Sequence, residues 1–266
     1  MLKIFSGIKR SDSYVLNLLG VQVFRIIAYK IKVFISHLIL NGINTSNRNE
    51  LSMYGIMQIS DIFPDFDLLN KKREEFILDN RLNSFHLLGA DYKELILDDE
   101  VIADYQLVEI FDDFYAKIIP ILSKSLKRNI LKKMINISFQ SIEMDPDVVD
   151  KQNEWHADCF YDTFKGFVFF DDVKSDGAPF TYLCGSNKIG MQRLIDEYRN
   201  SLRFDLDAST RFNINPNDKN ILELKVKKNC LIIANTCGIH KRKAITKSVT
   251  RQCIYFFVRP NPFKPW

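Results

Sequence analysis

The second half of the chain is a series of short apolar runs, and this pattern is the strongest constraint on the fold. Beyond about residue 134 the runs are rich in β-branched and aromatic residues. They cover residues 135–144, 164–170, 180–183, 222–226, 230–234 and 252–259. Turn-forming segments such as SDGAP at 175–179 and CGSN at 184–187 separate them. Many short strands bounded by turns are typical of a β-sandwich or a jelly roll.

The first half of the chain has a different, mainly helical pattern. Residues 12–41 are predicted to be helical, and the polar, turn-rich segment 41–49 marks the end of this extension. Residues 54–76 indicate a short strand, a turn at Pro64 and a helix. Residues 107–131 indicate a helix that Pro120 breaks or kinks. We therefore expect an α+β protein with an N-terminal helical extension over 1–45 and one domain over 46–266, whose β core spans about 134–260.

Composition restricts the choice of partner. The chain has 266 residues, of which 46% are hydrophobic and 26% charged, and this supplies enough apolar material for a full core. The net charge of +4 is small for a chain of this length. Dedicated nucleic-acid binders have a much stronger basic face, so no nucleic-acid partner is expected. A small-molecule substrate fits this composition, and a homo-oligomer remains open.

The cysteines indicate a reducing compartment. There are five, an odd number, and none forms a CxxC pair. A disulfide framework is therefore not expected in a chain of this size. The N-terminus has no signal-peptide cleavage pattern. We expect a cytoplasmic protein, with attachment at the inner face of a membrane as an alternative.

Residues 15–40 are strongly apolar, but Arg25, Lys30 and Lys32 interrupt them, so no uncharged run is long enough to cross a bilayer. Residues at helical spacing predict one apolar face, made of Leu16, Leu19, Val23, Ile27 and Phe34. One interpretation is a helix packed on the domain or on a partner subunit. The other is peripheral membrane contact through residues 12–41, with the basic side chains near lipid headgroups.

Two of the four histidines lie in the β-rich half, in a pattern that metal sites use. His156 and Asp158 are two residues apart, so in a strand their side chains point to the same face. His240 supplies a third ligand. Two histidines and one carboxylate leave three positions open on Fe(II), which 2-oxoglutarate and O₂ require. An isolated HxD is common by chance, and an isolated histidine is more often a surface or core-edge residue.

The surroundings of His240 strengthen this interpretation. An apolar strand at 230–234 precedes it, and Arg251 follows it by eleven residues at the start of another apolar run. Two paired strands joined by a loop would bring Arg251 close to the metal. A guanidinium there is suited to binding a carboxylate through two hydrogen bonds. The alternative for Arg251 is a solvated charge at the start of a strand.

These segments together resemble the phytanoyl-CoA dioxygenase family of Fe(II)/2-oxoglutarate oxygenases. The matching stretches are WHAD at 155–158, DDVKSDGAPFTYLCGSNK at 171–188 and NTCGIHKRKAITKSVTR at 235–251. Residues 54–76 also look like the entry-helix region of such proteins. The resemblance covers about residues 52–262. It departs from the usual pattern at Cys184, where members often have Pro, and at Asn187, where they often have His.

The resemblance implies a double-stranded β-helix, a cupin-like jelly roll, with iron inside one mouth. It implies that His156, Asp158 and His240 hold the metal and that Arg251 binds the distal carboxylate of 2-oxoglutarate. Related halogenases replace the carboxylate ligand with a small residue, so Asp158 favours hydroxylation.

Other positions are weaker candidates. Gln140, Lys165 and Thr181 are candidates for binding 2-oxoglutarate, and Ser141 beside Gln140 is similar. An outward-facing strand position is the alternative for each. Three more residues border the motifs and also suit core or turn roles: Trp155, Asn235 and Thr236. The basic trio Lys241–Lys243 suits either an anionic substrate or simple solvation.

The sequence does not select a substrate. We expect hydroxylation of a small organic, lipid-linked or glycan-linked compound, with release of succinate and CO₂. Two other functions fit part of the pattern: a non-catalytic, cupin-like barrel that binds a small molecule, and a membrane-associated interaction protein. Neither alternative requires the complete His–Asp–His–Arg set.

Overall fold

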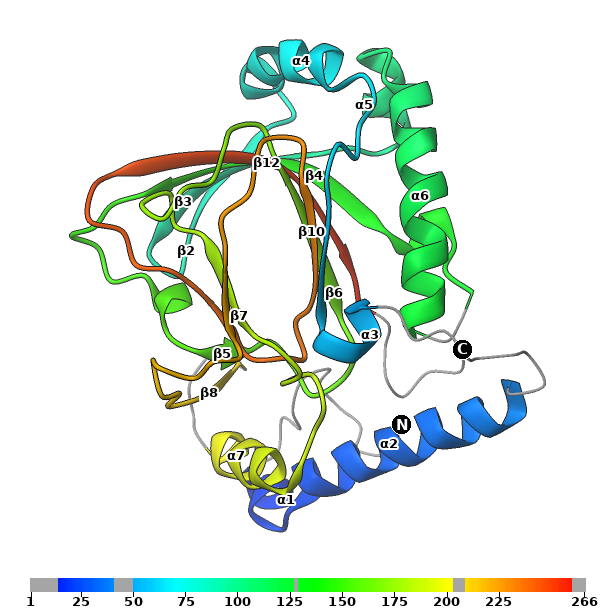
Figure 1. Cartoon of the computed structure of the whole chain (residues 1–266), viewed down its shortest axis with the longest axis vertical. Helices are drawn as coiled ribbons and strands as arrows, with labels where there is room; N and C mark the ends of the chain where they lie inside the picture. Colours follow the sequence, from blue (N-terminus) through cyan, green and yellow to red (C-terminus); the bar gives the residue numbers. More distant parts are fainter. Residues whose placement is uncertain (1–13, 41–49, 127–128, 203–208, 260–266) are drawn as a thin grey trace.

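The computed structural model describes residues 14–40, 50–126, 129–202 and 209–259. Two antiparallel sheets face one another and form a jelly roll, with helices packed outside them (Figure 1). This is the predicted α+β, double-stranded β-helix architecture.

The larger sheet has seven strands. In spatial order they are β1 (Ile56–Ile59), β10 (Leu231–Asn235), β6 (Phe164–Phe169), β12 (Val249–Val258), β4 (Asn136–Met144), β3 (Ala90–Ile96) and β2 (Asn83–Leu87). The smaller sheet has five: β8 (Thr210–Arg211), β5 (His156–Ala157), β11 (His240–Arg242), β7 (Phe180–Leu183) and β9 (Ile221–Leu224). The six apolar runs predicted as strands all form strands, within a few residues of the expected bounds.

Alternation along β12 separates the two faces of the seven-stranded sheet. Ile254 and Phe256 pack against the helical layer, whereas Cys253 and Tyr255 face the five-stranded sheet. The helical layer consists of α4 (Phe66–Leu78), α5 (Asp99–Asp104) and α6 (Val108–Leu126); the short α3 (Glu50–Tyr54) precedes β1 and adds Leu51 to the same core. Phe114 of α6 meets Phe256 edge to face, at 5.9 Å between ring centroids. The space between the sheets is therefore kept separate from the helical core.

Two helical predictions need correction. Pro120 lies inside α6 and does not break it, so of the two predicted effects the break is excluded. Helix α6 is described as far as Leu126, and the chain is no longer helical at residue 129, so the helix is shorter than predicted; a 3-10 turn at Lys132–Met134 leads into β4. Another 3-10 turn, Lys151–Asn153, precedes β5.

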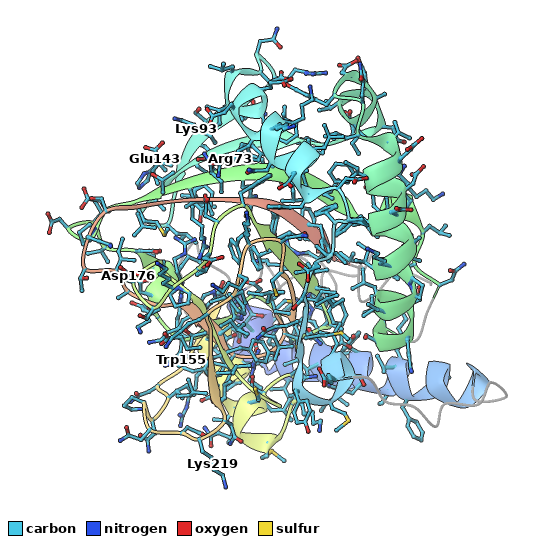
Figure 2. The ribbon with its side chains drawn as sticks, turned by 45° about the horizontal axis from the view of Figure 1, so that its top comes forward. Arg73, Lys93, Glu143, Trp155, Asp176 and Lys219 are labelled. Carbon is cyan, nitrogen blue, oxygen red and sulfur yellow. The ribbon has the colours of Figure 1, made fainter. Side chains whose placement is uncertain are left out.

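The seven-stranded sheet extends beyond the predicted core of 134–260, because it takes β1, β2 and β3 from earlier in the chain. The β2–β3 hairpin was missed: every residue of β2 is exposed, and its apolar alternation is limited to Phe85 and Leu87. Lys93 of β3 and Glu143 of β4 form an ion pair at 3.2 Å near this edge, visible in Figure 2. The predicted domain boundary near residue 45 lies outside the described residues.

The N-terminal segment is helical, as predicted for residues 12–41, but it is divided. Helix α1 (Tyr14–Leu18) ends at Gly20, whose φ of 80° lies in the left-handed region, and α2 (Val21–Leu40) follows. Helix α2 runs along one end of the molecule beside α7 (Met191–Ser201), which was not predicted (Figure 1). None of the helices in the described ranges combines the length and the apolar character needed to span a bilayer.

The buried face of α2 is not the predicted one. Ile26 and Tyr29 pack against Cys159, Phe160 and Tyr161 in the loop after β5. Gln22 and Arg25 are also buried, whereas three members of the predicted apolar face are exposed: Leu19, Ile27 and Phe34. Helical periodicity located the apolar residues correctly but did not show which side meets the domain.

Candidate metal centre

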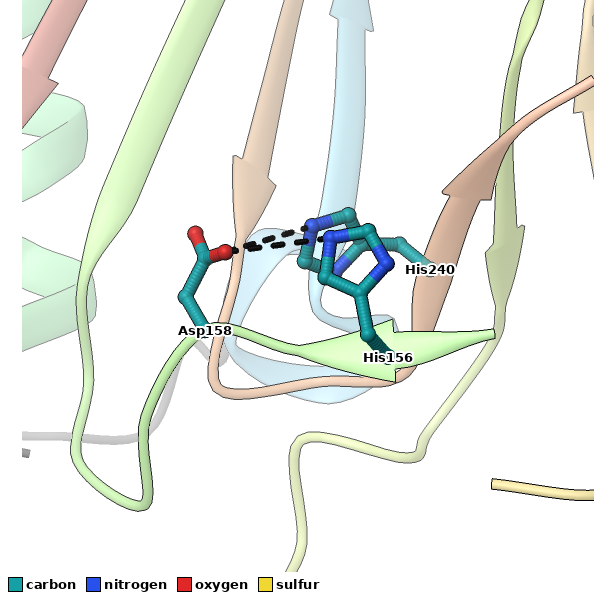
Figure 3. Close-up of side chains that lie close together, drawn as sticks. All are labelled: His156, Asp158 and His240. Atoms are coloured by element: carbon teal, nitrogen blue, oxygen red, sulfur yellow. Dashed lines mark ion pairs between the residues drawn. The ribbon is translucent and has the colours of Figure 1, made fainter. Parts of the chain in front are cut away.

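Three side chains, two from neighbouring strands and one from the loop after the first of them, converge inside the barrel (Figure 3). His156 of β5 is the direct antiparallel partner of His240 of β11, and Asp158 follows β5. One ligand atom from each of the three residues lies within 4.8 Å of the others. Asp158 Oδ1 is 3.9 Å from His156 Nε2 and 4.0 Å from His240 Nε2. The sequence predicted this cluster, and the strand register explains why the residues meet.

Backbone carbonyls fix the orientation of both imidazoles. His156 Nδ1 lies 2.8 Å from the Glu154 carbonyl oxygen, and His240 Nδ1 lies 2.9 Å from that of Gly238. A carbonyl only accepts a hydrogen bond, so Nδ1 carries the proton in each ring and Nε2 presents its lone pair. His156 Nε2 is buried and has no hydrogen-bond partner among the described residues. This donor set fits a divalent transition metal.

Burial keeps the two histidines neutral. It lowers the pKa of His156, although the charge of Asp158 opposes the shift. Burial also lowers the pKa of His240, to about 3, and neighbouring His156 adds to this effect. Neutral imidazoles are the form that binds a metal, so both side chains are ready as ligands at neutral pH.

Lys165 of β6 contacts the carboxylate ligand. Its Nζ lies 2.7 Å from Asp158 Oδ2, while Oδ1 faces the imidazoles. Burial lowers the pKa of Lys165, but the charge of Asp158 and its hydrogen bond to Lys165 outweigh this and raise the pKa above the usual value. Lys165 is therefore an ammonium that holds Asp158 with one oxygen toward the centre. Its predicted contact with 2-oxoglutarate remains a prediction.

A hydrogen-bond network supports the loop after Asp158. The Asp158 backbone N–H donates to the Thr236 carbonyl oxygen at 3.0 Å. Asn235 donates through Nδ2 to Asp162 Oδ1 at 2.7 Å, and Tyr29 of α2 donates to Asp162 Oδ2 at 2.9 Å. Asn235 and Thr236 thus hold the metal-site loop. Sequence reasoning missed Asp162 and Tyr29, because they are 133 residues apart and no local pattern joins them.

Arg251 of β12 is a half-buried cation without an acidic partner among the described residues. Its guanidinium lies 5.2 Å from the centre of the Phe169 ring and donates to the Ala178 carbonyl oxygen, with an N–O distance of 2.6 Å. Its Nε is buried and has no hydrogen-bond partner among the described residues, and no ion pair there includes Arg251. Burial, with the charge of Arg242, lowers the pKa of Arg251 to about 10, which still leaves it charged at neutral pH. This arrangement suits an incoming carboxylate.

Phenylalanine rings connect the histidines to Arg251. Phe180 stacks on His240 with 5.2 Å between centroids and lies 5.8 Å from Phe167. Phe167 is 6.2 Å from Phe169, the ring beneath Arg251. The metal ligands and Arg251 therefore border one apolar wall between the sheets.

The remaining candidates for binding 2-oxoglutarate divide between the two faces of their strands. Gln140 faces the other sheet, and its Nε2 donates to Glu94 Oε1 at 2.7 Å. Ser141, the next residue along β4, faces the opposite way. Thr181 pairs with Lys241 and lies between Phe180 and Tyr182, both of which face the interior. Ser141 and Thr181 are thus on faces turned away from the cluster, because strand side chains alternate.

Each member of the basic trio after His240 has a partner within the chain. Lys241 Nζ lies 4.9 Å from the ring centre of Trp155, a half-buried residue that is labelled in Figure 2. Arg242 pairs with Asp150 at 3.0 Å and donates to Tyr92 Oη at 2.8 Å. Lys243 pairs with Glu223, with 2.9 Å between Nζ and Oε2. These contacts favour a structural role over binding of an anionic substrate.

Comparison with known proteins shows the fold but no close relative. No protein-family model and no curated protein matches the sequence. Among solved structures, HygX from Streptomyces hygroscopicus with nickel and 2-oxoglutarate bound is similar, with a TM-score of 0.50 and 13% identity over 81% of this chain and 87% of that one. SnoN, a non-heme alpha ketoglutarate dependent epimerase from nogalamycin biosynthesis, has a TM-score of 0.49 and 8% identity over 80% and 84%. EvdO2 from Micromonospora carbonacea var. aurantiaca has a TM-score of 0.48 and 12% identity over 84% and 98%. At this level of identity, the likeness to HygX shows that the two chains share a fold.

Proposed function

We propose that this chain is a non-haem Fe(II)/2-oxoglutarate-dependent dioxygenase that hydroxylates a small organic substrate. Substrate C–H, O₂ and 2-oxoglutarate give C–OH, succinate and CO₂. The observation that carries the proposal is the convergence of His156 Nε2, His240 Nε2 and Asp158 Oδ1, with both imidazoles fixed by backbone carbonyls. HygX, which shares the fold, has been solved with nickel and 2-oxoglutarate bound.

The protein residues have separate tasks in this reaction. His156, Asp158 and His240 would hold the metal from one side, and a bound Fe(II) would supply the activation of O₂. Lys165 holds Asp158 by its outer oxygen. Arg251 would take the distal carboxylate of 2-oxoglutarate, and the phenylalanine wall would exclude water from the space between the sheets.

The order of the motifs supports a finer assignment within these oxygenases, to a group like the phytanoyl-CoA dioxygenases. WHAD at 155–158 is followed by the GSNK segment at 185–188 and then by His240 and Arg251. The retained Asp158 supports hydroxylation over halogenation. We also propose the division into an extension over 1–45 and a catalytic domain over 46–266.

The decisive experiment is anaerobic addition of Fe(II) and 2-oxoglutarate to the purified protein. Chelation of iron by 2-oxoglutarate in an open two-histidine, one-carboxylate centre gives a weak visible charge-transfer band. We expect this band in the wild type and its loss in His156→Ala and Asp158→Ala. His86→Ala is the matched control, because His86 is exposed and pairs with Asp91 at the surface.

Two results would contradict the proposal. A folded, metal-loaded wild type without the band would favour a barrel that binds a metal or small molecule without catalysing oxidation. Loss of the band in His86→Ala as well as in the ligand variants would show that the signal does not report on this centre.

A further inference from the structure

We propose that the outer face of the α1–α2 segment is a docking surface for an anionic lipid bilayer. The surface consists of large apolar side chains that are 45–74% exposed: Val15, Leu18, Leu19, Phe24, Ile27, Ile31, Phe34 and Ile35. The five on α2 follow helical spacing and share one side of the helix. Single exposed apolar residues are ordinary, but a contiguous row of this length marks an interaction surface.

The surface continues onto α7. Met191 and Ile195 of α7 are also exposed, and α2 and α7 are neighbours. Between them lies a groove of about 290 Å³, lined by Ile27, Lys30, Ile31 and Phe34 of α2 and by Ile189 and Leu194. This groove therefore joins the apolar row on α2 to apolar side chains at the start of α7.

The opposite face of α2 packs on the domain, so the exposed apolar face is not the one that contacts the core. Ile26 is 1% exposed and packs on Phe160 and Tyr161. Tyr29 donates to Asp162 at 2.9 Å. Arg25 is buried, with its guanidinium 5.7 Å from the Phe160 ring centre. These contacts hold the apolar face outward in a fixed orientation.

The charge beside the apolar row indicates which kind of partner binds this surface. Residues 14–40 contain no acidic residue, and the cations of α2 outside its buried face are Lys30 and Lys32. Lys30 is exposed and lines the groove among apolar side chains, so an ammonium stands beside the surface that would enter the lipid. An anionic headgroup layer over an acyl interior matches this pairing of charge and apolar area. A second copy on the same patch would bring like-charged helices together, with no acidic residue on either α2 to offset them.

The test uses the full chain and sedimentation with vesicles of phosphatidylcholine, either alone or with about one third phosphatidylserine. We expect binding to the anionic vesicles, with a bound fraction that falls as salt rises. Ile31→Ser should weaken this binding about ten-fold, because one large side chain no longer enters the lipid. Lys30→Glu should weaken binding to anionic vesicles while leaving any weak binding to neutral ones unchanged.

Leu78→Ser is the matched control. Leu78 is 83% exposed at the end of α4, on the opposite end of the molecule from α2 (Figure 1), so this change should leave vesicle binding as in the wild type. Thermal melts of all three variants check that each is folded.

Three outcomes would overturn the proposal. The wild type could remain in the supernatant with both kinds of vesicle. Leu78→Ser could lose as much binding as Ile31→Ser. Alternatively, the wild type could be a lipid-independent dimer that Ile31→Ser converts to a monomer, and the occupant would then be a second copy of the chain. The visible band of the metal centre is measured separately, so failure here leaves the proposed oxidation intact.

Discussion

Contacts distinguish two arginines that look alike in the sequence. Arg242 and Arg251 both follow His240, and both carry a charge into the space between the sheets. Arg242 is neutralised by Asp150, whereas Arg251 has a carbonyl and an aromatic ring but no acid. An enclosed cation without a counter-charge is costly unless an anion joins it. This contrast assigns Arg251 to the anionic co-substrate and Arg242 to the scaffold.

Arg251→Gln should therefore raise the dissociation constant of 2-oxoglutarate by about 30-fold or more, the usual cost of removing one partner of a buried charge pair. Titration of the visible band at fixed Fe(II) measures this, and metal binding should be unchanged. Arg73→Gln is the control, since Arg73 pairs with exposed Asp171 on the surface. Equal affinity in Arg251→Gln and wild type would rule out the assignment.

For single residues, spacing rules predicted the contacts between positions that are close in the sequence. The two-residue spacing of His156 and Asp158 predicted that they meet, although Asp158 lies just after β5, and the distance from His240 pointed to Arg251. The same rules could not find Tyr29 or Asp162, whose contact depends on how a helix docks on a distant loop. Nor could they place Ser141 and Thr181, because the face of a strand follows from its register with neighbours.

Apolar patterns in the sequence predicted some of the helices and strands but not others. Strands buried on both sides were predictable, since their runs are almost continuously apolar. Strand β2, exposed throughout, gave no such pattern. The buried face of α2 was not predicted, because it includes the charged residue Arg25. The Arg25 guanidinium lies 3.3 Å from Gln22 Oε1 and over the Phe160 ring. A charged side chain with such partners can lie at a buried interface, although charged residues are usually exposed.

The C-terminal end of α4 offers a test of electrostatic stabilisation away from the metal centre. Hydrogen bonds from Arg81, and another from Tyr105, hold the pKa of Asp79 well below its usual value of 3.8. A carboxyl whose folded pKa is lowered stabilises the protein above its unfolded pKa, and this contribution is lost as pH falls through the folded value. Asp79→Asn should thus lower the urea midpoint at neutral pH.

The difference in urea midpoint between wild type and Asp79→Asn should be steady down to a pH of about 5 and shrink below about 4. Urea unfolding at neutral pH, at about 5 and at about 3 measures it. A difference that stays constant across this range would mean that the ionised carboxylate is not the source of the stabilisation.

The metal centre draws on both sheets, so its occupancy should affect the whole molecule. The ligands come from the five-stranded sheet and the loop after β5, while Lys165 and Arg251 come from the seven-stranded sheet. The fold class was predictable, because a series of short strands after helices has few solutions. The order of strands was not, because it depends on pairings between segments far apart in sequence.

Loading with Fe(II) and 2-oxoglutarate, each at about 100 times its dissociation constant, should raise Tm by about 10–20 °C, because ligands that bind only the folded state stabilise it by mass action. A chelator should reverse the shift. Asp158→Ala should show little or none, as measured by differential scanning calorimetry under anaerobic conditions. An equal shift in Asp158→Ala would place the stabilising metal elsewhere.

The position of β12 has a consequence for how the chain assembles. It is the last strand in sequence order among the described residues, yet it lies between β6 and β4. Until it docks, β1–β10–β6 and β4–β3–β2 are two half-sheets, each with an open edge of unpaired N–H and C=O groups. Such edges are templates for pairing with another chain. Insertion of β12 therefore closes both edges in one step, and a nascent or partly unfolded chain is most vulnerable to aggregation just before it.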